Sequence, residues 1–474
     1  MADAVAIVGN NVAALVAAQS LAARGRSVML VNPGDRWGGH FGSVDAGAYR
    51  FDPGMVLYEF SAFNTETSPD VMSYDPDVRN DCGRFTAVVR EYIERRLETV
   101  TTPAPEMFVR GRRYPDVIIG NRLDALRLMD PDDRRAIADD LQMAAAQRRP
   151  SLHPSQKTSG PAFDHADFTS VSLANHGRAF HDWFVEPLCR KILGVSTGDI
   201  LARYHRVAWL PLYYPETLRS QFGPEPQRLP APAFHYPIAG TAGALATTLA
   251  AEIESDQNIR VLRSTVLEAQ GAGPFTLTLA DGTSTEAVDL VWGLEASSLI
   301  AARDPGMPRA NSTRSSIGLG FIAVSAGRLT ANSSTLFVLD PEHAVYRVTD
   351  QDACARADAP VHRLAVEFSL DAIARRSHPA ADAWPNRLRH ELVEIGVIDS
   401  PESVLYCSVR PMKNVLTVPS RANRDVFEEQ RAWLARHCPG IRLVGPAAGF
   451  LASSMNDQIV QGLKIGAELG GATA

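Results

Sequence analysis

Small residues and an amide side chain near the start of the chain have the spacing of a dinucleotide-binding turn. Gly9, Asn11 and Ala14 follow an apolar run at residues 4–8, which indicates a buried parallel strand leading into a helix. Asn11 stands at the second glycine position of the Gly-x-Gly-x-x-Gly fingerprint, and Ala14 is an accepted substitute at the third. Helix amides at such a turn bind a pyrophosphate. A second apolar run ends at Asn32, where an acidic residue usually binds the ribose hydroxyls.

The elements that must position this turn follow from hydrophobic periodicity. The apolar spacing predicts helices at residues 12–23, 85–97, 121–148, 174–193, 243–254, 382–395, 424–437 and 455–469. Short apolar or alternating runs predict strands at residues 4–8, 27–31, 259–262, 265–269, 275–279, 290–293, 315–326, 345–349, 362–369, 403–418 and 441–445. A hairpin is expected around Gly111, an exposed loop at 150–165, and irregular structure at the proline-rich residues 210–235.

The composition excludes several classes of protein. At 474 residues the chain is long enough for two domains, and its net charge of −7 argues against nucleic-acid binding. Five scattered cysteines without metal-type spacing predict a cytoplasmic protein with no metal site. No signal peptide or apolar run of membrane-spanning length is evident, so we expect no integral membrane segment. The sequence leaves a homodimer open.

Six segments, in this order, resemble flavin-containing amine oxidases, protoporphyrinogen oxidases and UDP-galactopyranose mutases. After the N-terminal fingerprint they are Gly38-Gly39, Phe51-Asp52-Pro53-Gly54, Gly111–Pro115 followed by Asn121-Arg122-Leu123, Trp183–Pro187 with Lys191–Gly194, Tyr236–Thr241, and Gly445–Gly462 with Met455-Asn456-Asp457-Gln458. The chain departs from the mutases in three of these patterns: Met55-Val56-Leu57-Tyr58-Glu59 stands where the mutases have Phe-His-Thr-like residues, Leu193 replaces a tryptophan, and Pro446 replaces an arginine.

The resemblance implies an FAD cofactor bound in an extended form across a parallel sheet. It places Gly9, Asn11 and Ala14 at the pyrophosphate, and Asn32 at the adenosine ribose. It also assigns cofactor contacts to a further set of residues, which are Gly38, Gly39 and His40 near the phosphates and ribityl chain, Val266 at the adenine, and Gly445, Met455 and Asn456 at the phosphate and isoalloxazine ends. The amides at the start of the last helix would face the flavin, where the helix dipole stabilises an anionic reduced ring.

The expected fold is α/β, with a Rossmann-like FAD-binding domain of the glutathione-reductase type and an inserted mixed α+β substrate domain. Residues 1–60, 228–310 and 425–474 are expected to form the FAD-binding domain. Residues 61–227 and 311–424 are expected to form the substrate or cap domain. Both domains are therefore discontinuous in sequence.

Hydride transfer requires a substrate carbon held close to the flavin, and it can require a base. The candidate catalytic residues are Tyr236, His235, Arg347, Tyr406 and Arg410, with Tyr58, Glu59 and Lys191 as further pocket candidates. If the small-molecule substrate is anionic, the arginines gain weight. Three functions stay open: an FAD-dependent oxidoreductase acting on an amine, alcohol or C–C position, a mutase-like isomerase of a nucleotide sugar, and a non-catalytic nucleotide-binding scaffold.

Overall fold

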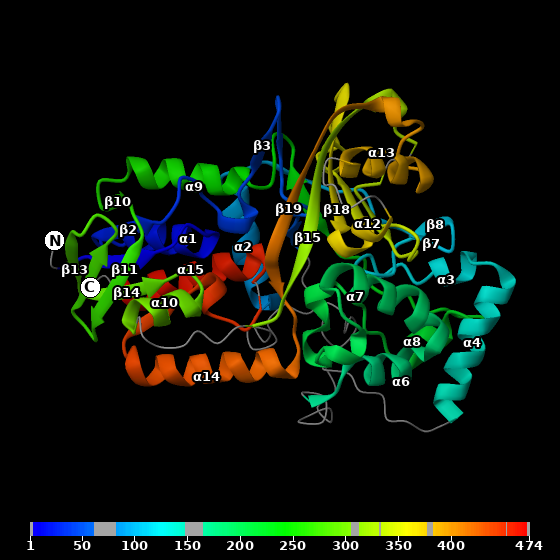
Figure 1. The fold of residues 1–474 in the computed structure, drawn as a ribbon, viewed down its shortest axis with the longest axis horizontal. Coiled ribbons are helices and arrows are strands. Elements are labelled where there is room, and N and C mark those ends of the chain that lie inside the picture. The colour runs from blue at the N-terminus through cyan, green and yellow to red at the C-terminus, as the bar shows by residue number, and fades with distance from the viewer. Residues whose placement is uncertain are drawn as a thin grey trace.

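A parallel sheet forms the centre of one half of the molecule (Figure 1). The computed structural model describes residues 3–60, 82–146, 165–304, 312–330, 333–376, 383–451 and 453–471. The sheet has the strand order β10-β2-β1-β14-β20 and is parallel throughout, with bounds β1 (Val5–Val8), β2 (Val28–Asn32), β10 (Ile259–Arg263), β14 (Asp289–Trp292) and β20 (Ile441–Leu443). The fully apolar β1 is central and buried on both faces, as its sequence predicts.

The two faces of this sheet pack against different layers. Val5 and Ile7 contact the helix layer of α1 (Val12–Ala22), α9 (Ala244–Ser255) and α15 (Met455–Leu469). Ala6 and Val8 contact a small antiparallel sheet, β11 (Val266–Gly271), β12 (Phe275–Leu279) and β13 (Ser284–Ala287), together with α10 (Ala296–Arg303) and α14 (Arg421–His437). The alternation of side chains along the strands thus places the sheet between a layer of helices and a mixed layer, which makes three layers in all.

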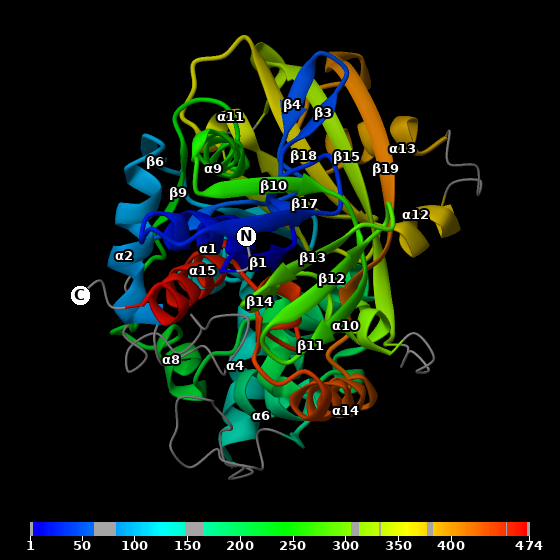
Figure 2. The same ribbon diagram turned by 90° about the vertical axis from the view of Figure 1, so that its left-hand side faces the viewer.

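Helices α1 and α15 lie side by side, although one begins and the other ends the chain (Figure 2). Glycines make this close approach possible. A Cβ atom on Gly462 would lie 2.6 Å from the Cβ of Val16, and a Cβ on Gly466 would overlap the hydroxyl of Ser20. The C-terminal helix is therefore an integral part of the half built on the parallel sheet.

A seven-stranded mixed sheet forms the core of the other half, and its long strands β15 and β19 stand between the two halves in Figure 1. Its strand order is β19-β15-β18-β17-β16-β7-β8. The bounds are β7 (Glu106–Val109), β8 (Arg112–Pro115), β15 (Arg314–Ser325), β16 (Thr335–Val338), β17 (Val345–Asp350), β18 (Val361–Ser369) and β19 (Val404–Thr417). The α/β fold with a second mixed domain is the expected class, while the exact division into domains stays a prediction.

The remaining helices are distributed over both halves, with α2 (Cys82–Glu94) packed against α15 of the parallel-sheet half, and short elements connect the halves. The others are α3 (Ala125–Leu128), α4 (Pro131–Ala146), α6 (Phe168–Phe180), α7 (Glu186–Leu193), α8 (Pro215–Ser220), α11 (Gln351–Cys354), α12 (Leu370–Arg376) and α13 (Trp384–Glu394), with a π-helical turn, η3 (His181–Val185). The short strands are β3 (Val44–Ala46), β4 (Tyr49–Phe51), β5 (Tyr58–Glu59), β6 (Thr99–Thr101) and β9 (Phe234–Pro237). In the described parts of the chain no helix is long and apolar enough to cross a membrane.

Two predicted helices differ from the structure for local reasons. The helix expected at 121–148 is two helices, because the chain is extended at Met129 and Pro131 starts a new helix at its first position. The helix expected at 174–193 begins at Phe168, capped by Asp167, and contains the π-helical turn η3. The hairpin at Gly111 is confirmed, with Arg110 and Gly111 at positive φ. Most of the expected 150–165 loop lies outside the described residues.

Candidate active site

A cavity of about 940 Å³ lies between the carboxyl ends of the parallel strands and the large mixed sheet. Residues that follow β2, β14 and β20 form one wall, among them Gly39, Glu295 and Pro446. Strands β15, β17, β18 and β19 form the opposite wall. In open α/β sheets the crevice at the carboxyl ends of the strands is where ligands bind.

A buried ion pair lies on the wall formed by the mixed sheet. Arg347 donates from Nε and Nη2 to the two carboxylate oxygens of Glu367, at 2.6 Å each. Glu367 also accepts the backbone amide of Met55 at 3.1 Å, and both charged side chains line the cavity. The bidentate geometry fixes the guanidinium plane, so this pair is a rigid charged feature of the site.

A β-bulge explains why neighbouring residues of β17 both line the cavity. The pairing between β17 and β18 shifts register between Val345 and Arg347, so that Tyr346 is the extra residue. Such bulges re-aim side chains that strict alternation would send to opposite faces. Burial raises the pKa of the Tyr346 phenol well above its usual value, and the Glu367 carboxylate beside it raises that pKa further. The phenol therefore stays protonated at neutral pH.

Trp209 adds an aromatic surface next to this pair. It follows the short 3-10 segment η5 (Ala202–Ala208) and has a positive φ of 57°. The guanidinium groups of Arg347 and Arg206 lie 5.7 and 5.6 Å from its ring, within the range of cation–π attraction. Trp209 lines the cavity, so a planar ligand group can pack against it.

The start of α15 brings to the cavity two side chains that each have a polar atom without a hydrogen-bond partner among the described residues. Ser454 caps the helix, and its hydroxyl and the Asp457 carboxylate form a capping box. Ser453 and Gln458 line the cavity, and both are at least nine-tenths buried. The Ser453 hydroxyl and the Gln458 Nε2 have no partner within the described residues. A buried polar group of this kind is normally satisfied by a ligand or by water.

Two arginines give the cavity a positive bias. Arg36 and Arg410 line it and donate to backbone carbonyls, of Ser43 at 2.8 Å and of Asp45 at 2.9 Å. Neither forms an ion pair with a carboxylate of the described residues, whereas the other cavity arginines, Arg314 and Arg347, are paired with glutamates. These two arginines therefore add positive charge to the cavity wall that no carboxylate of the described residues pairs.

The predicted cofactor residues around Gly9 lie close together, and their side chains bond to other groups of the protein. Asn11 caps α1, with its Oδ1 accepting the Ala14 amide at 3.0 Å and its Nδ2 donating to the carbonyl of Gly293. Asn32 is fully buried and accepts the Gly34 amide at 3.0 Å, so its side chain stabilises its own loop. The expected ribose contact of Asn32 stays a prediction.

Only some of the predicted cofactor residues line the cavity. Gly39 and His40 line the cavity. A larger group does not, namely Gly9, Asn11, Ala14, Asn32, Gly38, Val266, Gly445, Met455 and Asn456. Gly445 packs against the Asn11 side chain, and the Asn456 amide donates to the Glu59 carbonyl at 2.7 Å.

Tyr236 and His235 lie outside the cavity lining, and the expectation that they act in catalysis stays a prediction. The fully buried Tyr236 donates its hydroxyl to Asp52 at 2.6 Å. Asp52 also accepts the amides of Ala242 and Gly243 at 2.8 and 2.9 Å. The His235 ring contacts Thr101 and packs on Phe60. These side chains join two chain segments rather than facing the site.

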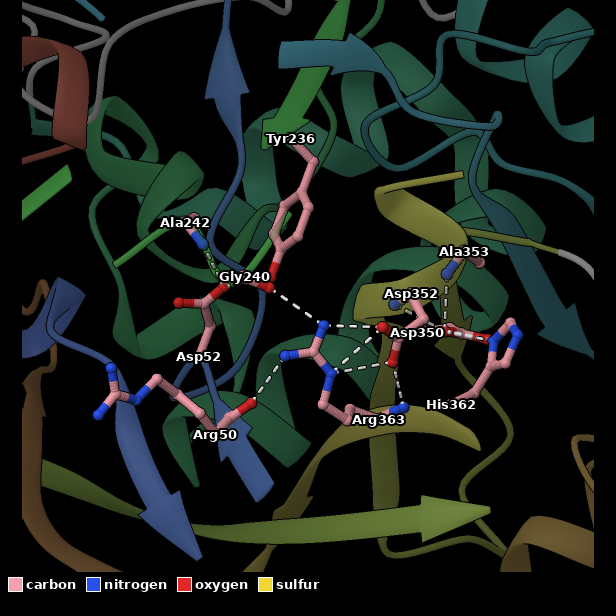
Figure 3. A network of polar contacts seen from close by, with 10 residues as sticks. All are labelled: Arg50, Asp52, Tyr236, Gly240, Ala242, Asp350, Asp352, Ala353, His362 and Arg363. Atoms are coloured by element: carbon pink, nitrogen blue, oxygen red, sulfur yellow. Dashed lines mark hydrogen bonds and ion pairs between the residues drawn. The ribbon is translucent and has the colours of Figure 1, made fainter. Parts of the chain in front are cut away.

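Arg363 extends this polar network into the mixed sheet (Figure 3). It forms an ion pair with Asp352 at 2.7 Å and donates to the carbonyls of Gly240 and Arg50 at 3.1 and 3.0 Å. His362 pairs with Asp350 at 2.7 Å, which raises the pKa of the imidazole. Through Arg363, the network joins β18 to the segment before Asp52 and to the segment after Tyr236.

The remaining candidates have structural surroundings. Tyr406 packs on Tyr49 and is absent from the cavity lining. Lys191 is buried and donates to the carbonyls of three residues near the ends of β16 and β17, namely Val338, Asp340 and Val345. Tyr58 is buried and donates to the carbonyl of Ala242 at 2.6 Å. Of the predicted catalytic residues, the cavity thus brings together Arg347 and Arg410.

Several lining residues were not predicted. Trp209 comes from a segment without periodic structure, and Glu367 and Tyr346 owe their orientation to the bulge. Gln458 belonged to the Met455–Gln458 motif but was not proposed as a contact. The sequence could have identified Gln458, since it lies in the first turn of the predicted last helix, whose start was expected to face the flavin. In the described residues, no group of three or more His, Cys, Asp or Glu could hold a metal ion.

Comparisons with known proteins agree with this architecture. A family model for NAD(P)-binding Rossmann-like domains matches residues 7–74, and no curated protein sequence matches the chain. A crystal structure of reduced UDP-galactopyranose mutase is similar over 100% of this chain and 95% of its own, with a TM-score of 0.75 and 16% identity.

Two further structures cover 99% of both chains. One is a candidate protoporphyrinogen oxidase from Exiguobacterium sp. 255-15, with a TM-score of 0.67 and 15% identity. The other is cyclohexylamine oxidase from Brevibacterium oxydans IH-35A, with a TM-score of 0.59 and 15% identity. The expected resemblance to this group of folds is confirmed along the whole chain.

Proposed function

We propose that this chain is a flavin-dependent oxidoreductase that binds FAD in the cavity and removes a hydride from a small molecule. The observation that carries the proposal is the cavity itself. It lies at the carboxyl ends of a Rossmann-like sheet and is lined by a rigid, buried Arg347–Glu367 pair. A site of this kind combines an apolar enclosure with a few fixed polar groups, as substrate and cofactor sites do.

Most of the cavity fits a flavin dinucleotide. Its volume of about 940 Å³ is at the upper end of the range for ligand pockets, about 300–1,000 Å³. The partnerless Ser453 hydroxyl and Gln458 amide can donate to carbonyl or ring-nitrogen acceptors of a bound ring. Arg36 and Arg410 favour a diphosphate or an anionic substrate. The predicted pyrophosphate turn, which lies outside the cavity lining, does not fit in the same way, because the Asn11 side chain already accepts the Ala14 amide there.

The residues of the chain supply binding and orientation. A bound flavin would supply the hydride acceptor. Trp209 and Phe321 offer apolar surface on the cavity wall, and Arg347, held by Glu367, presents a fixed positive charge to the substrate. An amine, an alcohol or a C–C position could be the site of oxidation. We expect an acidic group on the substrate to contact Arg410 near the exposed edge of the cavity.

The test is flavin content followed by anaerobic reduction. Purified protein, reconstituted with FAD, should have a flavin absorption spectrum and release FAD on denaturation. Addition of the correct amine, alcohol or acid from a panel of small molecules should bleach the spectrum without oxygen. Protein that neither retains FAD from the host nor takes it up on reconstitution would refute the proposal.

A mutase-like isomerase of a nucleotide sugar is the second candidate. It is favoured by the similarity to the reduced UDP-galactopyranose mutase structure, with a TM-score of 0.75. The segment Met55–Glu59, Leu193 and Pro446 differ from the mutase pattern, and they oppose this function. Conversion of a nucleotide sugar only after dithionite treatment, without net oxidation, would favour the mutase over the oxidoreductase.

A further inference from the structure

The pyrophosphate turn of this chain is filled by one of its own side chains. Asn11 is 4% exposed. Its Oδ1 accepts the amide of Ala14 at 3.0 Å, and its Nδ2 donates to the carbonyl of Gly293. Both ends of the amide group are therefore used inside the protein.

Glycine backbones surround the Asn11 side chain closely. Gly39 and Gly445 both have a φ of +58°, and a Cβ atom at these positions would lie 3.2 Å from the Asn11 Cβ and 2.6 Å from its Nδ2. In a dinucleotide-binding turn, glycines of this kind let the backbone approach a phosphate. Here the space between them holds an asparagine side chain.

A second side chain completes the substitution. Gln458, from the first turn of α15, accepts the amide of Ala13 at 3.4 Å. Two first-turn amides of α1, those of Ala13 and Ala14, therefore point to side-chain oxygens of the protein. Free first-turn amides are the groups that a helix N-terminus offers to an anion.

We propose that Asn11, with Gln458, is a built-in substitute for the cofactor pyrophosphate at the start of α1. The inference rests on the proposed function for the identity of the ligand. Because the substitute satisfies two first-turn amides, we expect the start of α1 to be stable without a nucleotide. A diphosphate gains contact with the Ala14 amide only if the Asn11 side chain moves, so we expect the adenine-nucleotide half to contribute less to binding than in a turn with glycine at this position.

The test compares wild-type protein with Asn11→Gly by calorimetric titration of ADP and FAD into nucleotide-free protein. Asn11→Gly should bind ADP about tenfold more tightly or better, because hydrogen bonds from amides to a charged phosphate are regained. The variant should also have a lower melting temperature without nucleotide, since the bonds to Ala14 and Gly293 are lost.

Two further variants keep the result interpretable. Asp167→Gly removes the cap of α6, whose carboxylate accepts the Ser170 amide at 2.8 Å far from the cavity lining, and it should leave ADP affinity unchanged. Asn11→Asp keeps the shape and the cap acceptor but adds a negative charge, so it should weaken ADP binding about tenfold. If Asn11→Gly does not fold, Asn11→Asp alone decides.

The outcomes separate the inference from the proposed function. Unchanged ADP affinity in Asn11→Gly and Asn11→Asp overturns the inference, even where wild-type protein binds FAD well. Tighter ADP binding by Asn11→Gly supports the inference, even where no variant binds FAD and the proposed function falls. Failure of every variant to bind either nucleotide overturns both.

Discussion

Replacing Glu367 by glutamine should lower the free energy of unfolding by about 3–5 kcal/mol, because the change leaves the Arg347 guanidinium charged and buried without its counter-ion. The side chains are 8% and 6% exposed, and the pair is joined by two hydrogen bonds of 2.6 Å. Two bonds to charged groups at about 1.5–3 kcal/mol each give a similar sum. The glutamine can still accept the Met55 amide, so the loss comes from the ion pair.

Urea denaturation followed by circular dichroism and tryptophan fluorescence measures this change. Glu91→Gln is the control, since its pair with Arg95 is exposed, with side chains 62% and 68% accessible, and should cost less than about 1 kcal/mol. The double variant Arg347→Met with Glu367→Gln should lose much less stability than the sum of the single losses, because no unpaired charge stays buried. A loss in Glu367→Gln equal to that of the control would refute the buried, bidentate pair.

Three other predictions concern stability. Burial raises the pKa of Glu59 to about 7. Between pH 4.5 and 7 the folded protein therefore keeps a proton on Glu59 that the unfolded chain has lost. The free energy of unfolding falls as the pH rises through this range. Glu59→Gln should reduce that fall by about 1–3 kcal/mol in urea titrations at pH 5 and 8, and equal slopes would contradict the assignment. Asp52→Ala removes three buried hydrogen bonds and should cost about 3 kcal/mol or more, measured by the same denaturation, whereas a loss below about 1 kcal/mol would disprove the network. Gly462→Val drives side-chain atoms into Val16 and should lower the melting temperature or the soluble yield, while Gly327→Val, at an open position without a positive φ, is the comparison and should do so less.

The parts of the fold that were predicted are those with strong periodicity. The helix expected at 455–469 coincides with α15, and the strand at 4–8 contains β1, because a buried helix and a doubly buried strand each have a clear apolar pattern. The break at Pro131 was missed, although proline at a helix start is a known signal. The π-helical turn at residues 181–185 has no pattern that distinguishes it from an α-helix.

The candidate site was less predictable, since its lining depends on local geometry and on partners distant in sequence. Arg347 was predicted, but its partner Glu367 lies on a neighbouring strand, and the bulge at Tyr346 cannot be read from alternation. Tyr236, in the Tyr236–Thr241 segment, was proposed as a catalytic candidate. Its phenol instead binds Asp52, from another of the motifs. The motifs thus identified contacts between segments better than they identified reacting groups.

The central claim is that the cavity between the parallel sheet and the mixed sheet binds FAD. A crystal structure of the protein after incubation with FAD tests it most directly. The account predicts density for the isoalloxazine ring in this cavity, within hydrogen-bond distance of Ser453 or Gln458 and near the Arg347–Glu367 pair. An empty cavity in crystals that contain saturating FAD, or a flavin bound elsewhere on the protein, would contradict it.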